Sequence, residues 1–414
     1  MKKILIVVAL VTTPALAQLA SDEIPHQRTL PVSEQVRNDL ETSRFRLGFL
    51  RIRPSLAVHD LGYDNNVLGT PTDPIGDWRS SVSAGAHFIV PLGRKIYARA
   101  SAVPEYTWYR KLTERRILGG NYGGSLLGLF NHVTVEGGAN AFSGLSILSS
   151  ELERETVGRR TLAYANVEVD VVRRLSIFGN AREEHQRYDL SANGLPALNG
   201  LQRNDRAFSS GLRYRFRSYF AVSIAAEKTT SEFLSATDHN NSSNAVLAGV
   251  RYDRPRSFIN LSVGSRTGEA RLPSVPDFPR YTTTTGSYYA AHDLGRHALV
   301  DVYGHRGLVY SLYINNAYYL ETRNGAGVVI PLGRRVAMRA FGEAGTNDYP
   351  RLVDGLKRSD DAAAWGGGVA VRFYRNLGIT AIASKTRYAS NFPGFDRSVL
   401  RIATAISLQR DLFR

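Results

Sequence analysis

The stretch TLAYANVEVDVVRRLSIFGNAR, residues 161–182, contains two runs of alternating apolar and polar residues around a short basic turn. The first run places Ala163, Ala165, Val167, Val169 and Val171 between Tyr164, Asn166, Glu168 and Asp170. The second run places Leu175, Ile177, Gly179 and Ala181 on one face, and Ser176, Asn180 and Arg182 on the other. A period of two is the pattern of a β-strand with one apolar and one polar face. The stretch therefore predicts an antiparallel hairpin of two-faced strands.

Similar short turns recur along the whole chain at intervals of about 40 residues. Two of them share their flanks, FIVPLGRKIYARA at 88–100 and VVIPLGRRVAMRA at 328–340. The turns are Pro91-Leu92-Gly93-Arg94, Phe130-Asn131-His132, Val172-Arg173-Arg174, Phe216-Arg217-Ser218, Pro255-Arg256-Ser257, Leu294-Gly295-Arg296, Pro331-Leu332-Gly333-Arg334 and Tyr374-Arg375-Asn376. Each turn is short enough to close a hairpin.

Longer segments rich in Gly, Pro, Asn, Asp and Ser connect the other ends of the strands. They are Asp60–Asp77, Ser146–Gly158, Tyr188–Asn204, Glu269–Arg280 and Thr346–Asp360. With a first strand at Phe49–His59 and a last one at Ser398–Leu408, the hairpins predict about 18 strands. Short turns on one side and long loops on the other are typical of outer-membrane barrels with short periplasmic turns and longer extracellular loops.

The polar faces carry charges that a dry core could not accommodate. They include Arg51, Arg53, Glu168, Asp170, Arg182, Arg213, Arg215, Asp301 and Arg339. A barrel of this strand number is too wide for side chains to fill, so these residues are expected to line a water-filled lumen. The apolar faces are then expected in lipid, where closure pairs every backbone group. The sequence thus predicts an all-β, transmembrane, antiparallel up-and-down β-barrel; a soluble eight-bladed propeller would need four short strands per period.

Aromatic residues cluster near the predicted strand ends, where they are expected to form girdles at the two membrane interfaces. They include Trp78, Tyr97, Tyr106, Trp108, Tyr109, Tyr214, Tyr303, Tyr310, Tyr318, Tyr319, Trp365 and Tyr374.

The first residues have the features of a secretory signal. Lys2 and Lys3 precede the apolar run 4–11, and Ala15-Leu16-Ala17 matches a cleavage site, which predicts a signal peptide at 1–17. The chain has no cysteine, which excludes disulfides, thiol catalysis and cysteine-ligated metals. A net charge of +15 favours anionic partners, and export argues against nucleic acid.

Arg51-Ile52-Arg53-Pro54-Ser55-Leu56, followed by Tyr63-Asp64-Asn65-Asn66-Val67, resembles the first strand and turn of a family of outer-membrane β-barrel porins. Some members of that family accompany exopolysaccharide synthesis and export systems. The resemblance implies a location in the outer membrane, contact with its lipids, and insertion by the outer-membrane assembly machinery. It implies no catalytic residues and no cofactor. Such barrels usually end on an aromatic residue, whereas here Phe413 is second to last.

Other candidate sites have simpler explanations. Asp60, Asp64, Asn65 and Asn66 carry oxygens suited to calcium, but Asx turns use the same residues. His292, His297 and His305 have no metal-site spacing, and no nucleophile elbow accompanies His59-Asp60, so neither a metal site nor an enzyme is predicted.

Segment 18–44 precedes the predicted barrel at 45–414. Within it, 33–41 has the composition of a short helix, either a periplasmic tether or a plug, although a disordered leader is the simpler expectation.

The lumen arginines either favour anions or pair with Glu168, Asp170, Asp301 and Glu343. The predicted function is a porin for small polar or anionic solutes or a polysaccharide. The alternative is a non-conducting partner of an exopolysaccharide system.

Overall fold

The computed structural model describes residues 32–43, 45–147, 149–151, 154–190, 196–271, 279–312, 316–353, 356–374 and 377–408. The predicted signal peptide at 1–17, residues 18–31 of the leader and Phe413 lie outside these residues. Among the described residues, no helix has the length and apolar character needed to cross a membrane.

Strands make up most of the described chain. The wall strands are β2 (Leu50–Asp64), β3 (Asp77–Pro91), β4 (Ile96–Tyr109), β5 (Ile117–Leu129), β6 (Val133–Ile147), β7 (Glu155–Val172), β8 (Leu175–Tyr188), β9 (Arg203–Arg217), β10 (Phe220–Phe233), β11 (Asn241–Arg254), β12 (Ser257–Ala270), β13 (Tyr281–Asp293), β14 (Leu299–Tyr310), β15 (Tyr318–Leu332), β16 (Val336–Val353), β17 (Leu356–Arg372), β18 (Leu377–Ser390) and β19 (Arg397–Leu408). The remaining elements are α1 (Val32–Thr42), β1 (Phe45–Leu47), η1 (Thr113–Arg115), η2 (Pro196–Leu201) and η3 (Thr237–His239).

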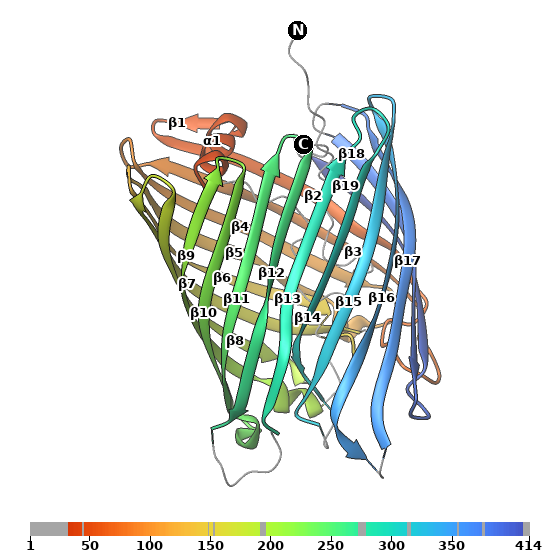
Figure 1. Cartoon of the computed structure of the whole chain (residues 1–414). Helices are drawn as coiled ribbons and strands as arrows, with labels where there is room; N and C mark the ends of the chain where they lie inside the picture. Colours follow the sequence, from red (N-terminus) through yellow and green to blue (C-terminus); the bar gives the residue numbers. More distant parts are fainter. Residues whose placement is uncertain are drawn as a thin grey trace.

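The wall closes because the last strand pairs with the first. β19 pairs antiparallel with β2, from Arg401 opposite Asp64 to Ser407 opposite Ala57. Every other wall strand pairs with its neighbours in the sequence, which gives a closed 18-stranded up-and-down barrel (Figure 1). The short strand β1 forms a hairpin with β2 and does not enter the wall. The predicted fold class and strand number are confirmed.

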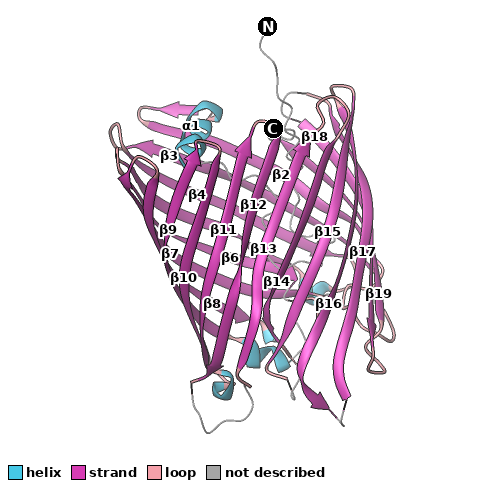
Figure 2. Ribbon diagram, viewed as in Figure 1, coloured by secondary structure: helices cyan, strands magenta, loops and turns pink. Residues whose placement is uncertain are grey.

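Each predicted short turn joins two consecutive wall strands. In Figure 2 these turns lie at the upper end of the barrel together with α1, and the longer loops lie at the lower end. We refer to the two ends as the periplasmic and extracellular ends, following the expected orientation of such barrels.

The predicted loop at Thr346–Asp360 is wrong for most of its length. β16 continues to Val353, β17 begins at Leu356, and a register shift between Asp348 and Leu352 accommodates the pairing. The segment is polar because it belongs to two strands with polar rows, not because it is irregular. Similarly, β2 continues to Asp64 through an irregularity at Asp60, whose φ is 54°.

The register separates an inward row from an outward row on every strand. Val167, Ile177 and Leu212 lie on the outward row and are 40, 48 and 46% exposed. Arg323 and Asn347, on the inward row, are fully buried. Apolar side chains therefore face outward and polar ones face the lumen, the reverse of a soluble barrel.

The structure bears out the predicted aromatic girdles only in part. Trp78, Tyr106 and Trp365 are 50, 44 and 47% exposed on the outer surface. Tyr109 and Tyr303 are buried instead, and their hydroxyls donate to Glu155 and Glu343. Since tyrosine has an apolar ring and a polar hydroxyl, its presence near a strand end does not reveal which face it takes.

Placing a charge on the outer face should destabilise the barrel. We expect Leu212→Arg to lower the free energy of unfolding by about 2–4 kcal/mol, the cost of an arginine near the middle of a bilayer. Asn180→Arg, on the exposed inward row of β8, is the control and should change it little. Reversible urea unfolding in lipid vesicles measures both. Equal effects of the two variants would contradict the assignment of the faces.

Candidate functional site

The charged residues selected from the sequence all lie on inward rows. One such row consists of direct cross-strand partners. It begins at Arg99 on β4, passes through Arg182 on β8 and ends at Thr229 on β10. Their neighbourhoods differ, however, and this decides which of them present charge to a passing solute.

Arg213 and Arg215 on β9 pair with acids on β7. Arg213 and Arg215 both bond to Glu168, and Arg215 also lies 2.7 Å from an oxygen of Asp170. Ser176 of β8, between them, donates to Glu168 at 2.9 Å. The cluster lies near the periplasmic turns of these strands and is balanced in charge. It contributes little net field to the lumen.

Arg182 has a different environment. It is exposed on the inward row, directly between Tyr164 and Ala207, and has no recorded hydrogen bond or ion pair to any part of the chain that the structure describes. Its charge is therefore available to a solute.

Asp301 and Arg339 lie on β14 and β16, on either side of β15. A Cβ at Gly327 would stand 2.3 Å from a carboxylate oxygen of Asp301, so only glycine leaves room for that carboxylate. The Arg339 guanidinium lies 5.8 Å from the centre of the Phe341 ring. β14 and β16 lie five and seven strands from β9 in the order of the wall.

The connection between β6 and β7 reaches across the lumen, which the sequence did not reveal. In the closed order of strands, β15 lies directly opposite β6. Ser150 nevertheless bonds to Glu321 on β15 and lies within 3.2 Å of the Tyr319 hydroxyl and 3.1 Å of Asn347. Arg397 of β19 donates to the Ser150 carbonyl at 2.6 Å. Residues 149–151 are therefore held against the far wall. We call them the crossing segment.

Glu151 is the anchor of the crossing segment. Its carboxylate accepts bonds from the Ser311 hydroxyl at 2.8 Å, the Leu312 amide at 2.9 Å and the Tyr349 hydroxyl at 3.0 Å. Burial raises the pKa of the Glu151 carboxyl above its ordinary value, although these three bonds and the charge of Arg358 partly oppose the shift. Asp360 of β17 accepts bonds from the Tyr349 hydroxyl at 3.3 Å and from Arg358 at 2.6 Å.

The part of this connection that leads into β7 is held against the near wall. Glu155, the first residue of β7, pairs with Arg79 of β3 and accepts from the Tyr109 hydroxyl at 3.1 Å. Arg115 of η1 donates to the Glu155 carbonyl. Burial beside Arg115 lowers the pKa of Arg154 to about 10. Bonds to both walls narrow the lumen at this level.

Helix α1 lies against the inner wall near the periplasmic end, which corrects the expectation of a disordered leader for residues 32–42. Val36 is 3% exposed and packs on Ile89 and Leu127, with Leu40 alongside. Residues 33–41 are helical, as their composition allowed, and the apolar residues of the helix explain its docking, because the inward row of the wall is apolar at these positions.

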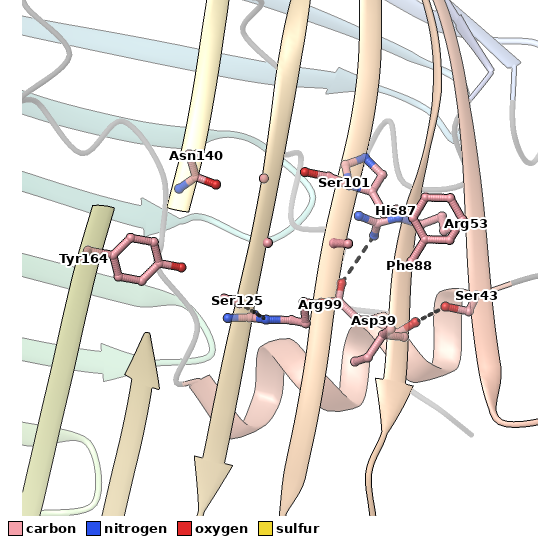
Figure 3. Close-up of a pocket in the computed structure, with 14 residues that line it drawn as sticks. Asp39, Ser43, Arg53, His87, Phe88, Arg99, Ser101, Ser125, Asn140 and Tyr164 are labelled. Carbon is pink, nitrogen blue, oxygen red and sulfur yellow. Dashed lines mark hydrogen bonds and ion pairs between the residues drawn. The ribbon is translucent and has the colours of Figure 1, made fainter. Parts of the chain in front are cut away.

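A cavity of about 230 Å³ separates α1 from the wall. Figure 3 shows Asp39 of the helix beside Arg53, His87 and Arg99 of the wall, with Ser43, just after the helix, bonded to the Asp39 carbonyl. Asp39 and Arg53 form an ion pair of 3.6 Å, and Arg99 bonds to Glu136. The cavity is small and lined mostly by polar side chains.

The remaining candidates have structural roles. Asp64 accepts from the Asn66 amide at 2.8 Å, an Asx turn, and pairs with Arg401 at 2.7 Å. Asp60 pairs with His59 at 2.9 Å and Arg79 at 3.3 Å. Within the described residues there is no group of three metal-ligating side chains. His305 bonds to Glu321 at 2.7 Å in the wall, and His292 bonds to Ser257 near a turn.

Comparisons with known proteins place the fold. No family model matches the chain, and a search of curated proteins finds no relative. Among solved structures, a BenF-like porin from Pseudomonas fluorescens Pf-5 aligns with a TM-score of 0.54 and 12% identity, over 87% of this chain and 100% of that one. The chain has the fold of outer-membrane porins.

Two further solved structures show how far this similarity of fold extends. The outer membrane protein opdK from Pseudomonas aeruginosa aligns with a TM-score of 0.53 and 9% identity, over 87% of this chain and 100% of that one. A bacterial polysaccharide outer membrane secretin covers 87% of this chain and 98% of its own, at 10% identity, but its TM-score of 0.37 supports no argument about polysaccharide.

The docking of the crossing segment should weaken as pH rises. Because the docked Glu151 has a raised pKa, the docked state binds a proton more tightly than a released state whose carboxyl faces water. Docking is then strongest below the ordinary glutamate pKa and weakens as pH rises through the raised value. The cysteine-free chain allows a direct measurement, the labelling rate of Ser149→Cys by a membrane-impermeant maleimide. The rate should rise severalfold with pH.

Two controls make this measurement specific. Ser235→Cys, exposed between β10 and β11, corrects for the pH dependence of the thiol itself. Glu151→Gln should remove the remaining pH dependence. If the corrected rate of Ser149→Cys does not change with pH, Glu151 does not control docking.

Releasing α1 from the inner wall should widen the aqueous path through the lumen. We expect Val36→Asp to undock the helix, because an unpaired carboxylate among Ile89 and Leu127 costs several kcal/mol. Single-channel conductance should then increase. Asn38→Asp adds the same charge on the exposed face of the same helix and should leave conductance near the original value. A similar conductance for all three proteins would show that α1 does not limit flow.

Proposed function

We propose that the protein is a porin of the Gram-negative outer membrane, through which small polar or anionic solutes diffuse along a narrowed aqueous lumen. The observation that supports this most is the closed 18-stranded wall with apolar side chains outward and charged side chains inward. Such a wall is stable in lipid and leaves a polar interior.

Two obstructions make the proposed channel selective in size. The crossing segment narrows the lumen toward its extracellular end, and α1 narrows its periplasmic end. A solute must pass the polar side chains that line both. No group of residues that the structure describes in this path has the arrangement of a nucleophile and its base, so we propose binding and passage, not catalysis.

Arg182 gives the proposed lumen its preference for anions. Glu168 and Asp170 compensate Arg213 and Arg215, whereas Arg182 faces the lumen without a counter-charge in the described structure. An unpaired cation on the wall attracts anions and repels cations. Ion selectivity is therefore best tested at Arg182, and not at Arg213 or Arg215.

The same obstructions favour a second candidate, a barrel without conductance that serves as a structural or assembly partner of an exopolysaccharide system. Bonds from the crossing segment to both walls and a docked helix could together close the lumen. Planar-bilayer recording separates the two. A reproducible open conductance supports the porin, and its absence in correctly folded protein supports the closed barrel.

Arg182→Gln should lower the preference for anions. A charge about 4 Å from an ion in water attracts an anion and repels a cation by about 1 kcal/mol each, so the ratio of anion to cation permeability should fall by up to roughly thirtyfold. Reversal potentials in a salt gradient measure this ratio. Arg182→Lys, which keeps the charge, is the control.

Replacing Arg213 and Arg215 by alanine should produce a larger shift toward cations, because Glu168 and Asp170 would then face the lumen unpaired. Unchanged selectivity in both Arg182→Gln and this double variant would contradict an anion preference set by the wall.

A further inference from the structure

A single cross-strand row forms much of the wall side of the cavity that faces α1. Arg53 of β2, His87 of β3, Ser101 of β4, Gly123 of β5 and Asn140 of β6 are successive direct partners. All five line the cavity of about 230 Å³. The row therefore crosses the cavity from one side to the other, with one residue from each of five neighbouring strands. We call it the cavity row.

The cavity row has hydrogen-bonding groups that the wall itself does not use. His87, Ser101 and Asn140 have no recorded hydrogen bond or ion pair to the residues that the structure describes. The Nε of Arg53 is buried and also has no hydrogen-bond partner among them. A neutral imidazole, a hydroxyl and an amide can each both donate and accept. The row thus offers a ligand both kinds of group at once.

Gly123 leaves space in the middle of the cavity row. Because it has no side chain, the wall is open there between Ser101 and Asn140, which Figure 3 shows on the two sides of β5. A Cβ at Gly123 would stand 2.2 Å from the amide oxygen of Asn140, so this amide leans over the glycine. Neighbouring strands lie about 4.8 Å apart, so the backbones at Ser101 and Asn140 are roughly 10 Å apart. A molecule lying over the glycine can reach both side chains.

The charges that line the cavity are balanced. Arg53 pairs with Asp39 of α1 at 3.6 Å, and Arg99 bonds to Glu136. Arg182, whose charge has no counter-charge in the described structure, does not line the cavity. A charged ligand would be attracted by one member of each pair and repelled by the other, and it would lose hydration on entering. A neutral ligand avoids that cost.

We propose that this cavity binds one neutral molecule that is rich in hydroxyl groups and of about the size of a hexose. The cavity has the volume of about seven or eight water molecules and is smaller than the sites of drug-sized ligands, which suits one sugar ring with its hydroxyls. Hydroxyls donate and accept, as the cavity row requires. This site deepens the proposed function and rests on it, since the lumen must admit solutes for the site to be filled.

Binding can be measured separately from conductance. The full chain is inserted into nanodiscs, with insertion verified by heat-modifiable migration on gels, and D-glucose binding is titrated by saturation-transfer-difference NMR against empty nanodiscs. D-glucuronate and protonated D-glucosamine, which add one negative or one positive charge to the same ring, are the matched probes. We expect both to bind at least about tenfold more weakly than glucose, because neither charge has a free counter-charge in the cavity.

The outcomes separate this site from the porin itself. Conductance without glucose binding would overturn the site and leave the porin intact. Glucose binding without conductance would support the site and count against the porin. Equal or tighter binding of either charged probe would overturn the neutral ligand.

The variant Ser101→Ala with Asn140→Ala should bind glucose about tenfold more weakly, as expected for the loss of one or two neutral hydrogen bonds. Ser209→Ala with Asn180→Ala is the matched control. These two residues also lie on inward rows, but they bond to each other at 3.0 Å and do not line the cavity. The control should bind within about twofold of the original protein. Equal loss in both double variants would contradict the proposal.

Asn140→Asp tests the charge balance with a side chain of almost the same shape. A carboxylate at this position should raise the affinity for glucosamine relative to glucose by about fivefold or more, and should weaken glucuronate further. A change in preference among three probes of one shape cannot come from a folding defect. If the order of the three affinities and their ratios stay unchanged, the ligand does not lie on the cavity row.

Discussion

The pairing of β19 with β2 is the constraint on which the rest of the structure depends. Without it, the sheet would expose two edges of unpaired amides and carbonyls, and lipid offers no partner for them. Closure with 18 strands also makes the interior too wide for the wall side chains to fill. Water must then enter, unless other parts of the chain occupy the space. The polar inward rows and the segments folded into the lumen are both consequences of that width.

The two obstructions are held by different forces. The crossing segment depends on hydrogen bonds and charges, with Glu151 accepting three bonds and Ser150 contacting several side chains of the far wall. Helix α1 depends mainly on apolar contacts of Val36 with Ile89 and Leu127. A change of pH or ionic strength therefore acts on the first and has little effect on the second.

The inner and outer faces place charge for different purposes. Inside, most arginines have acidic partners close by, so that the wall is polar without a large net field, and Arg182 is an exception. Outside, charge is absent from the apolar band and returns where headgroups are expected. The same alternation of residues along each strand produces both distributions, because neighbouring residues point to opposite faces.

The sequence by itself determined most of the strands, their short turns, the strand number and the face that residues in clearly alternating runs take. These properties are local: an alternating run such as 161–171 specifies its faces without knowledge of any partner, and Val172-Arg173-Arg174 specifies its own turn. Only the tertiary structure decided which strand closes the ring, that residues 149–151 cross the lumen, that α1 docks inside, and that Arg213 is compensated whereas Arg182 is not. Each of these depends on contacts between residues far apart in the sequence, such as Ser150 and Glu321. The alternation of residues along one strand carries no information about which residues it contacts across the barrel.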